Sequence, residues 1–124
     1  MGIQRFDRSM WINVCAAISA NLLGKRAEIE IVSPADGLLT EALGQPVLGI
    51  IYDPANDVLT ILLEGIDHFV FQPKEVYLDL RLGGDVSLGI LDKADAWHIV
   101  LLRDPLMLPR AAASLDARQG GNAS

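Results

Sequence analysis

The close spacing of turn-forming residues after residue 25 constrains the fold more than any other feature of this sequence. Short apolar or alternating segments are separated by stretches rich in Pro, Gly, Asp and Asn, and no second long helical pattern follows. Connections this short cannot make parallel crossovers, which need about a dozen residues. The sequence therefore predicts a mostly antiparallel sheet of about six short strands. The candidate segments are 27–31, 47–52, 58–63, 76–80, 86–91 and 96–102, with a short edge piece at 68–71 before Pro73.

One amphipathic helix is predicted ahead of the sheet, over residues 9–24. Its large apolar side chains recur at helical spacing, at Trp11, Val14, Cys15, Ile18 and Leu22. A solvated helix face normally carries Glu and Lys, but the second face here carries small uncharged residues: Asn13, Ala16, Ala17, Ala20 and Asn21. We therefore expect this face to be covered, either by a second copy of the chain or by residues 38–43 or 106–108 folding over it.

These patterns together predict an α+β domain in which an N-terminal helix precedes a mostly antiparallel sheet that curls into a small open barrel. The 124 residues fit one domain, predicted at 1–109, and the Ala-, Gly- and polar-rich residues 110–124 are expected to form a mobile tail. Residues 38–44 are expected to be a loop or a short helical turn. In the last strand, alternation predicts Trp97 in the core and His98 on the more exposed face.

A series of landmarks resembles a family of small bacterial proteins known only as a domain of unknown function. The landmarks are Trp11, Gly24-Lys25-Arg26, Glu28-Ile29-Glu30, 48–54, 63–68, 73–77 and 102–109. The Asp-Gly turn usual in that family before the last strand is Asp95-Ala96 here, so we expect this turn to be built differently. The resemblance implies a cytoplasmic bacterial protein and no particular activity. The order of elements is also similar to Sm-like and SH3-like barrels, a likeness of topology that implies no function.

Charge and cysteine content narrow the classes of partner and compartment. The formal net charge of −6 disfavours nucleic acid and anionic membrane surfaces, because both attract a positive face. Cys15 is the single cysteine, so no intrachain disulfide is possible. The start of the chain is superficially like a signal peptide, but Asn13 and Asn21 interrupt its apolar run, which is too short to span a bilayer. We therefore predict a cytoplasmic protein with neither a membrane nor nucleic acid as partner.

His68 is the ionisable residue with the strongest indication of chemistry. It follows Asp67, and Glu64 and Glu75 are near in sequence. A carboxylate beside a histidine can orient the ring and raise its basicity, as a general base requires. No nucleophile motif accompanies it, and Cys15, His68 and His98 lack the spacing of a metal site, so no metal or cofactor is predicted. The competing interpretation is a structural histidine whose ring bonds a backbone carbonyl at a bend.

The sequence leaves the biochemical function unknown and supports two hypotheses. The first is a non-catalytic domain that acts through protein–protein contact, including self-association as a homodimer through the second helix face. The alternative is a small-molecule binder or weak enzyme with a cleft around His68, lined by Asp67, Glu64 and Glu75. Of the two, the non-enzymatic hypothesis is preferred because no catalytic constellation accompanies His68.

Overall fold

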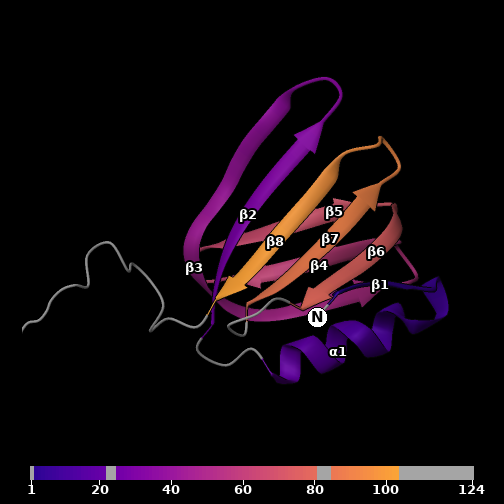
Figure 1. The fold of residues 1–124 in the computed structure, drawn as a ribbon. Helices are drawn as coiled ribbons and strands as arrows, with labels where there is room; N and C mark the ends of the chain where they lie inside the picture. Colours follow the sequence, from indigo (N-terminus) through magenta and orange to yellow (C-terminus); the bar gives the residue numbers. More distant parts are fainter. Residues whose placement is uncertain (1, 22–24, 81–84, 104–124) are drawn as a thin grey trace, which may run out of the picture.

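The long strand β3 (Gly37–Asp53) determines the shape of the sheet, because its two halves pair with different neighbours. Residues 37–46 pair with β2 (Arg26–Ser33), whereas residues 47–53 pair with β4 (Val58–Leu63). The sheet therefore turns at β3, and its two parts face each other across one core, as the computed structural model in Figure 1 shows. The structure describes residues 2–21, 25–80 and 85–103.

Eight strands form one sheet in the described residues, and every pair of neighbouring strands is antiparallel. Their order is β1-β6-β7-β8-β2-β3-β4-β5, with β1 and β5 as unjoined ends. The remaining elements, in chain order, are β1 (Gly2–Phe6), a 3-10 turn (Arg8–Met10), α1 (Trp11–Ala20), β5 (Ile66–Phe71), β6 (Pro73–Leu80), β7 (Val86–Asp92) and β8 (Trp97–Arg103).

The predicted mostly antiparallel sheet is confirmed, but three details of the predicted fold are wrong. Residues 2–21, 25–80 and 85–103 form eight strands rather than about six, their sheet does not close into a barrel, and β1 precedes the helix, so the helix is not N-terminal. The strand β1 forms because all five of its residues pair with β6, a tertiary contact that a local pattern does not reveal. Residues 38–44 are also strand rather than a loop or helical turn. Gly37, with φ of 68°, lets the chain fold back so that they pair with β2.

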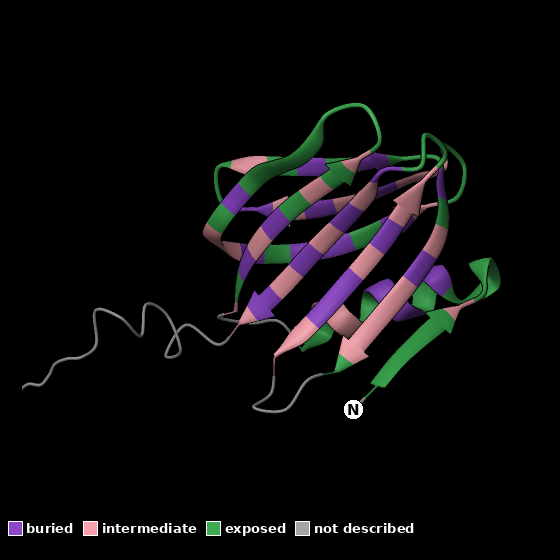
Figure 2. Cartoon of the chain, turned by 45° about the horizontal axis from the view of Figure 1, so that its top comes forward, coloured by how far each residue is buried: buried purple, intermediate pink, exposed green. Residues whose placement is uncertain are grey.

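The core lies between the two parts of the sheet, and buried residues alternate with less buried ones along the strands (Figure 2). On β8 the buried side chains are His98, Val100 and Leu102, whereas Trp97 is half-buried on the outer face. The predicted faces of this strand were therefore wrong. The fully buried large side chains come from the helix and from every strand except β1: Trp11, Ile29, Ile50, Leu59, Ile61, Val70, Pro73, Val76, Leu88, Ile90, Val100 and Leu102.

The helix α1 lies along the second half of β3 and satisfies part of its backbone. Its Ser19 hydroxyl donates to the Ile50 carbonyl and accepts from the Ile50 N–H, both at 2.8 Å. The start of the helix is anchored by Arg8, which bonds Tyr52 and Asp57 at 2.9 and 3.0 Å and lies over the Trp11 ring. The Ser19 side chain thus bonds the edge of β3 where a neighbouring strand would otherwise pair.

Several sequence predictions fall on residues that the structure does not describe. These are Leu22 and Gly24 at the predicted end of the helix, the domain boundary at 109 and the tail 110–124. No helix in the described part of the chain is both long enough and apolar enough to cross a membrane.

Candidate functional site

Two histidines from opposite parts of the sheet meet in the core. His68 lies on β5 and His98 on β8, and their side chains are joined by a hydrogen bond of 2.9 Å between Nε2 of His68 and Nδ1 of His98. Both residues are buried, with exposed fractions of 5% and 6%. The pair therefore links β5 directly to the facing strand β8 through the interior.

Asp92, the last residue of β7, holds the other end of this chain of hydrogen bonds. Its Oδ2 lies 2.8 Å from Nε2 of His98, and its Oδ1 accepts from the backbone N–H groups of Ala94 and Ala96 at 2.8 and 3.0 Å. Asp95 adopts a positive φ of 65° in this turn, which Asp tolerates better than most residues. The turn is thus built without the glycine that is usual in the resembled family.

Electrostatics fixes the direction of the hydrogen bonds. Burial alone would raise the pKa of Asp92, but the bonds from His98, Ala96 and Ala94 outweigh it and lower that pKa. Because the ionised carboxylate only accepts, His98 donates to it from Nε2. In the tautomer with one proton on each ring, Nδ1 of His98 then accepts from Nε2–H of His68. Burial, with a smaller contribution from His98, lowers the pKa of His68 to about 4. His68 is therefore neutral at pH 7.

The carboxylate that contacts the histidine pair is that of Asp92, and not one of the three carboxylates predicted from the sequence. Asp67 is exposed and points to the face of β5 opposite to His68. Glu64 is exposed in the turn between β4 and β5, and Glu75 accepts a hydrogen bond of 2.7 Å from the Tyr77 hydroxyl. The sequence signal for this carboxylate was the turn at 92–95 immediately before β8. It was missed because alternation along the strand had placed His98 on the outer face.

The chemistry available to this Asp92–His98–His68 chain is limited by its burial. Neither histidine lines the groove between the helix and β3 or the groove on the outer face of β6, β7 and β8. In the described residues no group of three or more His, Cys, Asp or Glu side chains is placed to hold a metal ion. Burial raises the pKa of the Cys15 thiol to about 11, so this cysteine is a protonated core residue at neutral pH. The arrangement orients the two rings and joins the two parts of the sheet.

The second face of the helix is exposed along its whole length. The five residues proposed for it, Asn13, Ala16, Ala17, Ala20 and Asn21, are all exposed, and Asn21 donates to the Ala17 carbonyl at 2.8 Å. Residues 38–43 do not cover this face, because they pair with β2, and residues 106–108 lie outside the described residues. A groove of about 480 Å³ runs between the helix and β3, lined in part by Ile12, Ala16, Ala20 and Ile51.

Apolar side chains continue from this groove across the outer face of β3, β4 and β5. Ile51 lies opposite Thr60, and Thr60 lies opposite Phe69, so the three form one cross-strand row. Phe69 stacks on Phe71 with ring centroids 5.9 Å apart. The exposed fractions are 52% for Ile51, 47% for Phe69 and 63% for Phe71. We call the surface formed by Ile12, Ala16, Ala20, Ile51, Phe69 and Phe71 the contact face.

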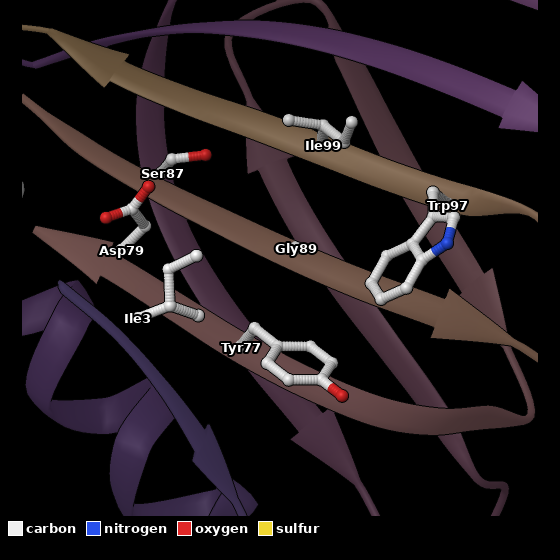
Figure 3. Close-up of a pocket in the computed structure, with 7 residues that line it drawn as sticks. All are labelled: Ile3, Tyr77, Asp79, Ser87, Gly89, Trp97 and Ile99. Atoms are coloured by element: carbon white, nitrogen blue, oxygen red, sulfur yellow. The ribbon is translucent and has the colours of Figure 1, made fainter.

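A second groove, of about 390 Å³, lies on the outer face of β6, β7 and β8. Figure 3 shows Tyr77 and Trp97 on the two sides of Gly89, with Asp79 and Ser87 further along the groove. A Cβ built on Gly89 would lie 3.7 Å from the Trp97 ring, so the indole covers the strand where the glycine has no side chain. Trp97 therefore packs on the outer face instead of the core.

Three basic residues of the described chain, Arg26, Arg103 and Lys74, are divided between the two ends of β8. Arg26 and Arg103 lie opposite each other on β2 and β8, and Arg103 is 3.3 Å from Glu28. Lys74 lies at the other end of β8, where it pairs with Asp95 at 2.6 Å.

Comparison with known proteins identifies relatives but no activity. Residues 2–111 match the model of DUF5335, described as a family of unknown function. An uncharacterized protein of Aquifex aeolicus (strain VF5) is 28% identical over 110 residues, covering 88% of this chain and 99% of that protein. No solved structure matches the chain. The resemblance to an uncharacterised bacterial family is therefore confirmed.

Proposed function

The chain belongs to the DUF5335 family of unknown function, and we propose that it is a non-catalytic domain that acts through protein–protein contact. The observation that carries the proposal is the contact face. An antiparallel sheet with one face toward the core normally presents polar residues on its other face. Here the outer face carries Thr60 and Asp67, but it also exposes three large apolar side chains, those of Ile51, Phe69 and Phe71.

The helix extends this face with small side chains. Ala16 and Ala20 line the groove beside Ile51, and Ile12 is 52% exposed at one end of it. Small residues let a partner backbone approach closely, while the larger apolar groups supply area to bury. The helix face with Asn13, Ala17 and Asn21 remains part of the proposed interface, and a homodimer or another protein is the proposed partner.

The alternative function is small-molecule binding or weak catalysis at His68. The observation in its favour is the ordered hydrogen-bond chain that ends on the partly exposed carboxylate of Asp92, whose side chain is 16% exposed. A ligand would have to reach a histidine that is 5% exposed, so this proposal ranks second. The proposed ligand-contacting residues remain His68, Asp67, Glu64 and Glu75.

The proposed cellular location and class of partner follow from the charge of the chain and from the chemistry of its thiol. We propose a cytoplasmic location, where a single free cysteine such as Cys15 stays reduced. The formal net charge of −6 and the separation of Lys74 from Arg103 favour a protein partner over nucleic acid. No metal or cofactor enters the proposal.

Photo-crosslinking tests the contact face directly. A photo-reactive residue at Ile51 in the full chain, made in the cells that naturally produce it, should give an adduct of defined mass that contains a second copy or one other protein. The same residue at Asp36, exposed in the turn between β2 and β3, is the matched control and should give none. Equal labelling at both positions, or no adduct at Ile51, would contradict protein contact at this face.

A further inference from the structure

We propose that two copies of this chain pair through the outer edge of β5, as antiparallel strands centred on Phe69. The inference rests on the proposed function, because Phe69 and Phe71 belong to the contact face, and it places a second copy at the β5 edge of that face. Three observations carry it: the direction of the backbone groups of β5, the lack of protection along its edge, and the placement of its one charge.

The phase of the hydrogen bonds shows which backbone groups of β5 face outward. Residues 66, 68 and 70 lie opposite residues 63, 61 and 59 of β4, and Gln72 N–H donates to the Asp57 carbonyl at 2.8 Å. Hydrogen-bonded pairs alternate along an antiparallel ladder. Residues 66, 68 and 70 share the phase of Gln72 and bond toward β4. The backbone groups of residues 67, 69 and 71 therefore point to the outer edge, where no described strand pairs.

In the part of the chain that the structure describes, this edge lacks the devices that normally keep edge strands apart, which are Lys, Pro, bulges or a covering helix. The six residues Ile66–Phe71 contain neither Lys nor Pro, and their register with β4 shows no bulge. By contrast, the second half of β3 is covered by the helix through Ser19. The other end strand, β1, is five residues long and carries Arg5. The edge of β5 is thus the place where another strand can be added.

The charge pattern favours a second copy in one register. Asp67 is the single charged residue of β5, although the whole chain carries −6. In an antiparallel pair centred on Phe69, Asp67 of each copy lies opposite Phe71 of the other copy, so the two carboxylates do not face each other. Residues 67, 69 and 71 of both strands would exchange about six backbone hydrogen bonds.

The same symmetry makes the apolar surface continuous. A two-fold axis normal to the sheet keeps the outer face of both copies on one side, and such isologous dimers are the commonest oligomers. The Ile51–Thr60–Phe69 row of one copy would then run into the same row of the second. The two contact faces become one surface, with the helices at its far ends.

Light scattering on the full chain at tens of micromolar tests the assembly. We expect the wild type to have the mass of a dimer and Phe69→Pro to raise the dimer dissociation constant by about tenfold or more. Proline at this position removes an N–H that points outward and leaves the ladder to β4 intact. Phe69→Thr, which keeps the N–H but loses the ring, should weaken the dimer less. A monomeric wild type would overturn the proposal.

Disulfide trapping tests the register and does not depend on the proline variant folding. Two copies of Phe69→Cys would place their Cα atoms about 5.5 Å apart, within the range of a disulfide. Thr60→Cys is the matched control, because its copies would lie about 14 Å apart across three strand spacings. Cys15 can stay, since it is buried with a thiol pKa of about 11. We expect Phe69→Cys to form covalent dimers under mild oxidation and Thr60→Cys to remain monomeric on a non-reducing gel.

The outcomes separate this inference from the proposed function. If Phe69→Cys crosslinks no better than Thr60→Cys, pairing through β5 is overturned, whatever the mass of the wild type. The proposed function then still stands if the photo-reactive residue at Ile51 captures a defined protein. Both fail if neither experiment gives an adduct.

Discussion

At the scale of single residues, the hydrogen bond between the two buried histidines gives a direct prediction of stability. His68→Ala removes the donor to Nδ1 of His98 and leaves that buried nitrogen without a partner. The expected loss in the free energy of unfolding is about 1–3 kcal/mol. Asp67→Ala, on the exposed face of the same strand, is the matched control and should change it by less than about 0.5 kcal/mol. Chemical denaturation of the three proteins measures the difference.

The same variant separates the structural role of His68 from a ligand-binding role. If His68 is structural, any small molecule that raises the melting temperature of the wild type should raise that of a folded His68→Ala variant equally. A ligand-dependent shift that disappears in the folded variant would instead support the alternative function.

The protonation of His68 predicts how stability depends on pH. Its pKa is about 4 in the folded chain and about 6.5 when unfolded, so the unfolded state binds more protons between these values. The stability that the neutral His68 side chain contributes is fully present above pH 6.5. It is lost as the pH falls toward 4, by about 2–3 kcal/mol. The lowered pKa of Asp92 adds a further loss at still lower pH.

Denaturation midpoints at pH 7, 5.5 and 4 test this pH dependence. His68→Gln keeps a hydrogen-bond donor but cannot titrate, so its curve should be flatter than that of the wild type between pH 6.5 and 4. Identical slopes for the two proteins in this interval would show that another group is responsible.

At the scale of elements, the hydroxyl of Ser19 predicts how strongly the helix is attached to β3. Ser19→Ala removes both hydrogen bonds to the backbone of Ile50 and should cost about 1–2 kcal/mol. Ser9→Ala, in the exposed 3-10 turn before the helix, is the control and should be close to neutral. Hydrogen exchange at the Ile50 amide should accelerate in Ser19→Ala. An unchanged rate would mean that the hydroxyl does not protect this edge.

The elements also show what the sequence could and could not predict. Periodicity identified the apolar stripe of the helix through Trp11, Val14 and Cys15, all buried, and the hairpin between β3 and β4. It missed β1 and the first half of β3, because their strand state depends on pairing with β6 and β2.

The site was predicted less well than the fold, for reasons that also lie in tertiary structure. His68 was singled out correctly as an unusual residue, but its partner comes from a strand thirty residues away. Alternation along β8 could not show which face was inside, since both faces carry apolar residues. Exposure of Phe69 and Phe71 likewise depends on which way β5 packs, so the contact face required the structure.

At the scale of the whole molecule, two candidate self-association surfaces must be told apart: the helix face named from the sequence and the edge of β5. Ala17→Glu with Ala20→Lys places two charges on the exposed face of the helix, which lies beside β3, while β4 separates β3 from β5. If two copies pair through β5, light scattering should give a dimeric mass for this double variant at tens of micromolar and a lower mass for Phe69→Pro. Circular dichroism of both variants checks that they remain folded. A double variant that becomes monomeric while Phe69→Pro stays dimeric would assign the interface to the helix. The contact face would then hold its partner through the small residues beside Ile51, where two helices can approach closely.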